Sequence, residues 1–109
     1  MINHVVLMKF KPGVGEVDIE ELEKMLDELP NKIIEIHAYE FGRDRLRSKR
    51  SYDFALTAIF ANLEALNRYR KHPDRIPVAK KIQEITESIA TVDFEGYVPG
   101  SPEIAQRNV

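Results

Sequence analysis

The sequence contains no cysteine among its 109 residues. Without cysteine, the chain can form no disulfide, no thiolate metal site and no cysteine nucleophile. No apolar run approaches the roughly 20 residues that span a bilayer. The short apolar stretch from Val5 to Met8 is followed by a lysine, which does not fit a signal peptide. These absences lead us to expect a cytoplasmic protein that does not bind membranes.

A strong excess of charge of one sign is also missing. Sixteen Lys and Arg face eighteen Asp and Glu, for a net charge of −2. This balance argues against a nucleic-acid binder. Five basic residues gather within residues 43–50, but no aromatic side chains are interleaved with them, so a solvated hairpin loop is the favoured interpretation. Hydrophobic residues make up 43% of the chain and charged residues 31%, as in a folded domain with one core.

Hydrophobic periodicity predicts four strands and two helical regions. Strands are expected at residues 2–11, 33–41, 52–61 and 89–97, and helices at 17–29, at 63–71 and after Pro77. Asn62 is the expected N-cap of the helix at 63–71. This β-α-β-β-α-β order, with the second helical region split, predicts an α+β, ferredoxin-like fold whose antiparallel sheet carries helices on one face. We expect a single domain over residues 1–97 and a mobile tail over residues 98–109.

The face of the sheet away from the helices is predicted to be apolar. A bare apolar face of this size is unusual on a monomer, and a second copy packed face to face would cover it. We therefore expect a homodimer. The candidate interface residues are Val5, Leu7, Tyr39, Phe41, Ala55, Thr57 and Ile59.

Several segments together resemble the stress-responsive dimeric α/β-barrel (Dabb) family, over about residues 2–97. The segments that carry the resemblance are residues 2–11, Leu29-Pro30-Asn31-Lys32-Ile33, Phe41-Gly42-Arg43-Asp44, Tyr52-Asp53, Leu63-Glu64-Ala65-Leu66 with Tyr69 and His72-Pro73, and Val92-Asp93-Phe94. The resemblance implies a ferredoxin-like fold that dimerises into a barrel through the sheet faces. Similar proteins include plant stress proteins in stable assemblies, a plant polyketide cyclase, and bacterial proteins without an assigned reaction. The related antibiotic-monooxygenase barrels use a pocket between sheet and helices.

Three residues could serve such a pocket, and each has a structural alternative. His4 is expected on the helix-facing side of the first strand, either binding a ligand oxygen or satisfied at the edge of the core. Tyr69 could donate to a ligand carbonyl or carboxylate, or fill the core with its ring. His72 precedes Pro73 at a helix end, where a structural capping role is favoured.

Arg75 is the point at which this sequence departs from the cyclase-like members. In those members the motif is His-Pro-x-His, and the second His is the proposed base. Here the motif ends in Arg75, which stays protonated and cannot act as a base at neutral pH. It could bind a carboxylate or phosphate, or pair with Asp74 or a nearby glutamate on the surface.

The sequence thus predicts a homodimer that binds a small hydrophobic or aromatic acid in a pocket between sheet and helices. The candidate pocket residues are His4, Val6, Met8, Leu56, Tyr69, His72 and Arg75. No catalytic residue is assigned, and no metal site or cofactor is predicted. Two alternatives stay open: a structural, stress-related assembly module without a ligand, and a small cofactor-independent enzyme of the cyclase or monooxygenase kind.

Overall fold

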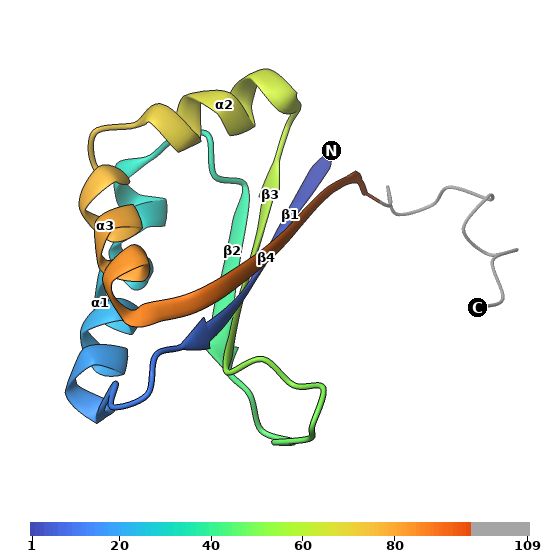
Figure 1. Ribbon diagram of the computed structural model, residues 1–109. Helices are drawn as coiled ribbons and strands as arrows, with labels where there is room; N and C mark the ends of the chain where they lie inside the picture. The colour runs from blue at the N-terminus through green and yellow to red at the C-terminus, as the bar shows by residue number, and fades with distance from the viewer. Residues whose placement is uncertain (97–109) are drawn as a thin grey trace, which may run out of the picture.

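Residues 1–96 are described by a computed structural model of the chain (Figure 1). The predicted mobile tail, residues 98–109, lies outside the described residues. The elements in chain order are β1 (Ile2–Phe10), α1 (Glu16–Lys32), β2 (Ala38–Arg43), β3 (Phe54–Phe60), α2 (Leu63–Lys71), α3 (Ile76–Ile85) and β4 (Thr86–Glu95).

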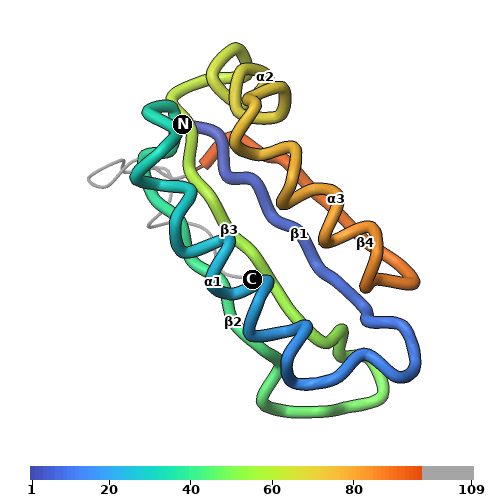
Figure 2. Tube along the Cα trace, turned by 90° about the vertical axis from the view of Figure 1, so that its left-hand side faces the viewer, coloured from blue at the N-terminus to red at the C-terminus, as the bar shows by residue number. Residues whose placement is uncertain are grey.

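The four strands form one sheet in the order β2-β3-β1-β4, and every neighbouring pair is antiparallel. All three helices lie on the same side of this sheet (Figure 1). Viewed from that side, α1 crosses in front of β3 and β2, whereas α3 lies nearer β1 and β4 (Figure 2). The predicted ferredoxin-like α+β fold, with helices on one face, is confirmed.

Local sequence signals explain where the helices lie. In α1, Leu22, Leu26 and Leu29 recur at spacings of four and three and are fully or almost fully buried against the sheet. The side chain of Asn62 accepts a hydrogen bond from the backbone N–H of Ala65 and so caps α2 as predicted. The predicted bounds of α2 are correct. Those of α1 are too short, because the helix continues through Pro30 to Lys32.

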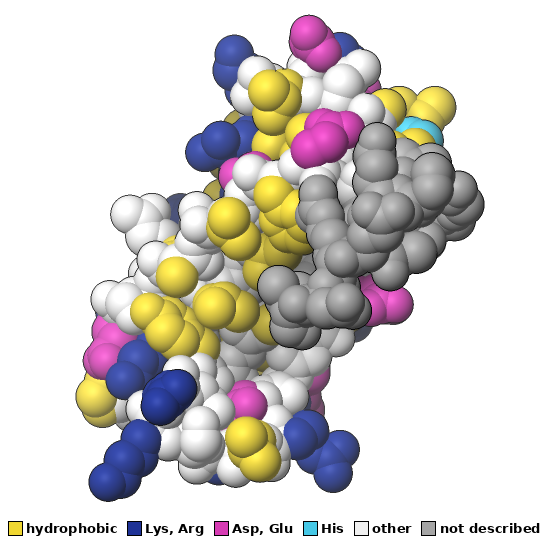
Figure 3. All heavy atoms as spheres, turned by 90° about the vertical axis from the view of Figure 1, so that its right-hand side faces the viewer, with side chains coloured by type: hydrophobic (Ala, Val, Ile, Leu, Met, Phe, Trp, Pro, Cys, Tyr) yellow, Lys and Arg dark blue, Asp and Glu magenta, His cyan; other side chains and the backbone are white. Residues whose placement is uncertain are grey.

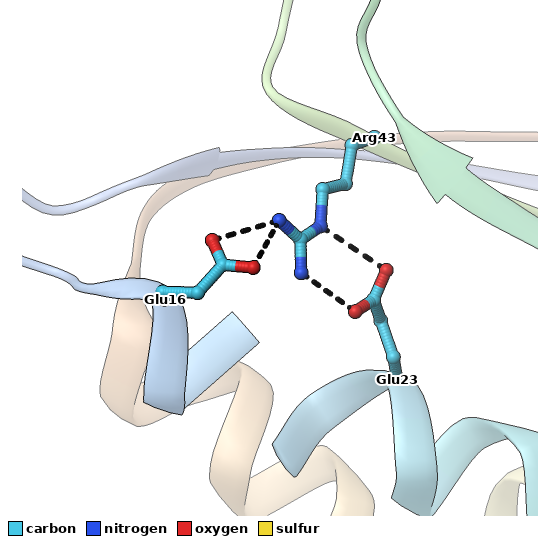
Figure 4. A network of polar contacts seen from close by, with 3 residues as sticks. All are labelled: Glu16, Glu23 and Arg43. Carbon is cyan, nitrogen blue, oxygen red and sulfur yellow. Dashed lines mark hydrogen bonds and ion pairs between the residues drawn. The ribbon is translucent and has the colours of Figure 1, made fainter. Parts of the chain in front are cut away.

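An arginine at the end of β2 ties the sheet to α1. The guanidinium of Arg43 donates to both carboxylate oxygens of Glu16, at 2.7 and 2.8 Å, and to those of Glu23, at 2.7 and 3.1 Å (Figure 4). These contacts raise the pKa of the Arg43 side chain above its ordinary value, the hydrogen bonds to Glu23 being the largest cause. The basic segment thus supplies intramolecular ion pairs, as Arg47 does with Asp53.

A second cluster of ion pairs holds α3 beside α1. The Nζ atom of Lys81 donates to a carboxylate oxygen of Asp18 at 3.2 Å and of Glu21 at 3.0 Å. Within residues 1–96, these are the side-chain hydrogen bonds that join α3 to α1, and they help to hold the two helices side by side. That placement matters for the site, which lies beneath α3.

The predicted positions of Tyr39 and Phe41 on the open face of the sheet are wrong. In the register of the sheet Tyr39 lies opposite Ala58 and Phe41 opposite Leu56, and these partners are buried beneath the helices. Both aromatic side chains pack against the core. The physical reason is that β2 turns its large apolar residues towards the helices and its smaller or polar ones outward, namely Ala38, Glu40 and Gly42.

The open face is nevertheless apolar across its other three strands. Hydrophobic side chains gather on this side of the molecule (Figure 3). On β4, Val92 is 54% exposed and Phe94 49% exposed, and they pair in register with Val5 and Asn3 of β1. The apolar residues of this face are Val5, Leu7, Ala55, Ile59, Ala90, Val92 and Phe94, together with Thr57. Val92 and Phe94 were not among the candidate interface residues.

Candidate functional site

A cavity of about 410 Å³ lies between α3 and the helix-facing side of β1, β3 and β4. Five of the seven candidate pocket residues line it: His4, Val6, Leu56, Tyr69 and Arg75. Its other lining residues come mainly from α3 and β4; they are Leu26, Arg70, Val78, Ala79, Ile82, Gln83, Ile89, Thr91 and Asp93. A cavity of this size suits a small organic molecule.

Two of the predicted pocket residues do not line the cavity. Met8 is fully buried in the core. His72 lies at the C-cap of α2, where its Nδ1 accepts a hydrogen bond from the backbone N–H of Asp74 at 3.1 Å. His72 thus lies at the helix end as expected, but the predicted contact is wrong, because its side chain bonds the following turn and not the last helical carbonyls.

His4 is buried at the wall of the cavity and is held by a residue of β4. Its Nδ1 lies 2.5 Å from Oδ1 of Asp93, directly across the β1–β4 ladder. The other ring nitrogen, Nε2, is buried and has no hydrogen-bond partner within residues 1–96. The site therefore contains one polar atom for which the described part of the chain supplies no partner.

Tyr69 forms part of the cavity wall and is 2% exposed. Its hydroxyl lies 2.8 Å from the hydroxyl of Tyr39 on β2, and its ring meets the ring of His4 edge-on at a centroid distance of 6.2 Å. Burial is the largest cause that raises the pKa of Tyr39 above its ordinary value, and the neighbouring Tyr69 adds to the shift. The phenol of Tyr39 is therefore a neutral hydrogen-bonding group at physiological pH.

Arg75 brings a positive charge to the same cavity. Its guanidinium carbon lies 5.2 Å from the centroid of the Tyr69 ring, a cation–π distance. A long hydrogen bond of 3.4 Å joins its Nη1 to the carbonyl oxygen of Arg70. Within residues 1–96 it makes no ion pair, whereas Asp74 lies near His72 instead. Arg75 and Asp74 therefore do not form the surface ion pair that the sequence also allowed.

The arrangement combines an apolar chamber, a cation, a buried imidazole and a phenol. Apolar walls are supplied by Val6, Leu56, Val78 and Ile82. Such a chamber can hold an apolar body, with an acidic group at Arg75. Across the described residues, no three His, Asp or Glu side chains are grouped so that they could hold a metal ion.

Asp93 is the residue that the sequence interpretation missed as part of the site. It lies 89 residues from His4 along the chain, and only the register of β1 against β4 brings the two together. The available signal was a carboxylate in the last predicted strand. It lies on the opposite face of that strand from Val92 and Phe94. The register that gives this signal its meaning cannot be derived from either strand alone.

The fold and the cavity together define a class of proteins: ferredoxin-like α+β domains with a chamber between the sheet and its helices. Residues 2–96 match the model of the stress responsive A/B barrel (Dabb) domain. The chain therefore belongs to the Dabb family, as its sequence segments indicate. Over the same described residues, no helix has both the length and the hydropathy needed to cross a membrane.

Similar proteins come from plants and bacteria. Stress-response A/B barrel domain-containing protein DABB1 of Arabidopsis thaliana is 33% identical over 99 residues, which cover 86% of this chain but 46% of the plant protein. The chain thus spans about half the length of that relative. The HS1 protein of the same plant is 28% identical over 96 residues, covering 86% of this chain and 88% of HS1.

A solved structure from Thermobifida fusca shows the same fold with a TM-score of 0.79. It is 28% identical, covers 85% of this chain and 88% of its own, and is described as a dimeric ferredoxin-like protein of unknown function. This similarity, together with the apolar open face, supports self-association of the present chain.

Proposed function

We propose that this protein is a homodimer that binds a small hydrophobic or aromatic carboxylic acid in the cavity beneath α3. The observation that carries the proposal is the guanidinium of Arg75, which makes no ion pair within residues 1–96 and lies at the wall of an apolar cavity of about 410 Å³. A half-buried arginine forms strong, bidentate hydrogen bonds with a carboxylate. The apolar lining favours a ligand whose body is a ring or a short hydrocarbon.

The cavity favours ligand binding over a purely structural module. A core in which Met8, Phe54 and Phe60 filled all the space beneath the helices would leave no room for a ligand. Here these three side chains are fully buried, yet a cavity bounded by His4 and Tyr69 exists beside them. Because Arg75 cannot take up a proton at neutral pH, the proposal is binding and not ring closure by a base at position 75.

The proposed dimer forms through the open face of the sheet. Val92 and Phe94 extend the apolar surface to the edge strand β4, and pairing two such faces would remove more than about 1,000 Å² from water, which is the scale of a stable interface. The helix-side cavity then stays on the outer layer of the barrel, where it remains accessible to small molecules.

Titration calorimetry with a panel of aromatic carboxylates tests the ligand. We expect the wild-type protein to bind at least one of them, and we expect Arg75→Ala to weaken that binding by tenfold or more, about 1.4 kcal/mol. Lys80→Ala is the matched control, because it removes a positive charge from α3 at a position that does not line the cavity. Equal affinity of wild-type protein and Arg75→Ala for the carboxylate would show that Arg75 does not bind it.

A further inference from the structure

One nitrogen of the buried His4 ring is satisfied and the other is not. Nδ1 is engaged by Asp93, whereas Nε2 is buried without a hydrogen-bond partner within residues 1–96. A buried polar atom left without a partner costs free energy. Protein interiors rarely tolerate such an atom unless a water molecule or a ligand group satisfies it.

Asp93 decides which ring nitrogen carries the proton. An ionised carboxylate can only accept hydrogen bonds, so the proton in the contact belongs to Nδ1, which donates to Oδ1 of Asp93 at 2.5 Å. In the neutral ring Nε2 then has a lone pair and no hydrogen, and it can only accept. The β1–β4 ladder holds His4 and Asp93 opposite each other, which keeps this assignment fixed.

The surroundings of the ring leave the cavity as the source of a partner. The Nδ1 edge is turned towards β4, and the rings of Phe60 and Tyr69 meet His4 edge-on at 6.3 and 6.2 Å. The hydroxyl of Tyr69 is engaged by Tyr39. His4 and Arg75 line the same cavity, so a molecule bound there meets the His4 ring and a positive charge in one chamber.

We propose that Asp93 is a positioning residue that holds His4 as a hydrogen-bond acceptor, so that the cavity selects ligands with a hydrogen-bond donor. The preferred ligand carries a carboxylate for Arg75 and an O–H or N–H group for Nε2 of His4. Hydroxy acids therefore bind better than the corresponding methyl ethers, which lack the donor. This inference rests on the proposed function, since it specifies the ligand of the same cavity.

A matched pair of ligands tests the selection. 4-Hydroxybenzoate and 4-methoxybenzoate both carry a carboxylate, but only the first has a hydroxyl donor. We expect wild-type protein to bind the hydroxyl compound about tenfold more tightly. His4→Phe, which keeps a ring and removes both nitrogens, abolishes the preference. Asp93→Asn reduces it, because an amide can either accept from Nδ1 or donate to it and no longer fixes the proton.

Two further measurements separate a specific role of Asp93 from a structural one. Glu95→Gln is the control, because it neutralises a carboxylate on β4 that does not line the cavity, and it leaves the preference unchanged. Nitrogen-15 NMR of the histidine rings should show Nδ1 of His4 protonated and Nε2 bare in wild-type protein, and a mixture in Asp93→Asn.

Three results overturn the proposal. Equal binding of the hydroxyl and methoxy compounds would show that the ligand does not partner Nε2, while leaving carboxylate binding intact. A wild-type ring that carries a proton on Nε2, whether or not Nδ1 is also protonated, would contradict the role of Asp93 in keeping Nε2 an acceptor. Failure of every carboxylate in the panel to bind would overturn the proposed function, and this selection with it.

Discussion

The hydroxyl groups of Tyr39 and Tyr69 lie 2.8 Å apart and join β2, at one edge of the sheet, to α2 above it. The ring of Tyr69 also packs on Phe60 at a centroid distance of 4.8 Å and lies beneath the guanidinium of Arg75. One phenol thus connects the edge of the sheet with the wall of the cavity. The pair makes the position of Tyr69, and with it the shape of the site, depend on a residue of β2.

Removal of one hydroxyl should destabilise the protein measurably. Tyr39→Phe leaves the buried hydroxyl of Tyr69 without its partner, and we expect a loss of about 1 kcal/mol, or a decrease of roughly 4–8 °C in melting temperature. Calorimetry at a fixed protein concentration measures the change in melting temperature. Tyr52→Phe is the control, since the Tyr52 hydroxyl makes no hydrogen bond to another described residue, and an equal effect of both variants would contradict the role of the pair.

The same tyrosine predicts how stability depends on alkaline pH. The pKa of Tyr39 is raised in the folded protein, chiefly by burial, whereas an unfolded tyrosine ionises near about pH 10. The unfolded state therefore loses its proton first. Stability due to this group is fully present below about pH 10 and decreases as the pH rises further. Denaturant unfolding from pH 8 to 11 should show a steeper loss in wild-type protein than in Tyr39→Phe, and parallel curves would contradict this assignment.

The ion pairs of Arg43 predict a salt-dependent contribution to stability. Replacing Arg43 by Ala removes hydrogen bonds to both Glu16 and Glu23 (Figure 4), so we expect a lower melting temperature. Because all three side chains are partly exposed, added salt should reduce the difference from wild type. Arg45→Ala, in the exposed loop, should change little. A difference that is independent of salt would point to lost packing instead of lost charge.

Much of the fold could be predicted from local patterns, and the errors in the faces of the sheet and in the site residues have a common physical origin. The alternation in β1 and the apolar spacing in α1 are properties of single segments, and both were interpreted correctly. The faces assigned to Tyr39 and Phe41 were wrong, because the face of β2 depends on its register against β3. Asp93 was missed for the same reason, since its role exists only once β4 pairs with β1.

The open face of the sheet predicts the effect of a charge placed on it. Ile59→Asp puts a carboxylate among the apolar residues that we expect to be buried between two copies, and the variant should become monomeric or aggregate. Ile34→Asp is the control, because Ile34 is 91% exposed at a site away from this face. Light scattering at low micromolar concentration measures both. An Ile59→Asp variant that stays dimeric and soluble would show that the copies pair elsewhere.

Native mass spectrometry of the full chain, incubated with the tightest carboxylate of the panel, tests the central claim most directly. It reports the number of chains and the number of bound ligands in one spectrum. We expect a particle of two chains that carries up to two ligand molecules, and an Arg75→Ala particle of two chains that carries none under the same conditions. A single-chain particle would contradict the dimer, and equal ligand occupancy of wild-type protein and Arg75→Ala would contradict carboxylate binding at Arg75.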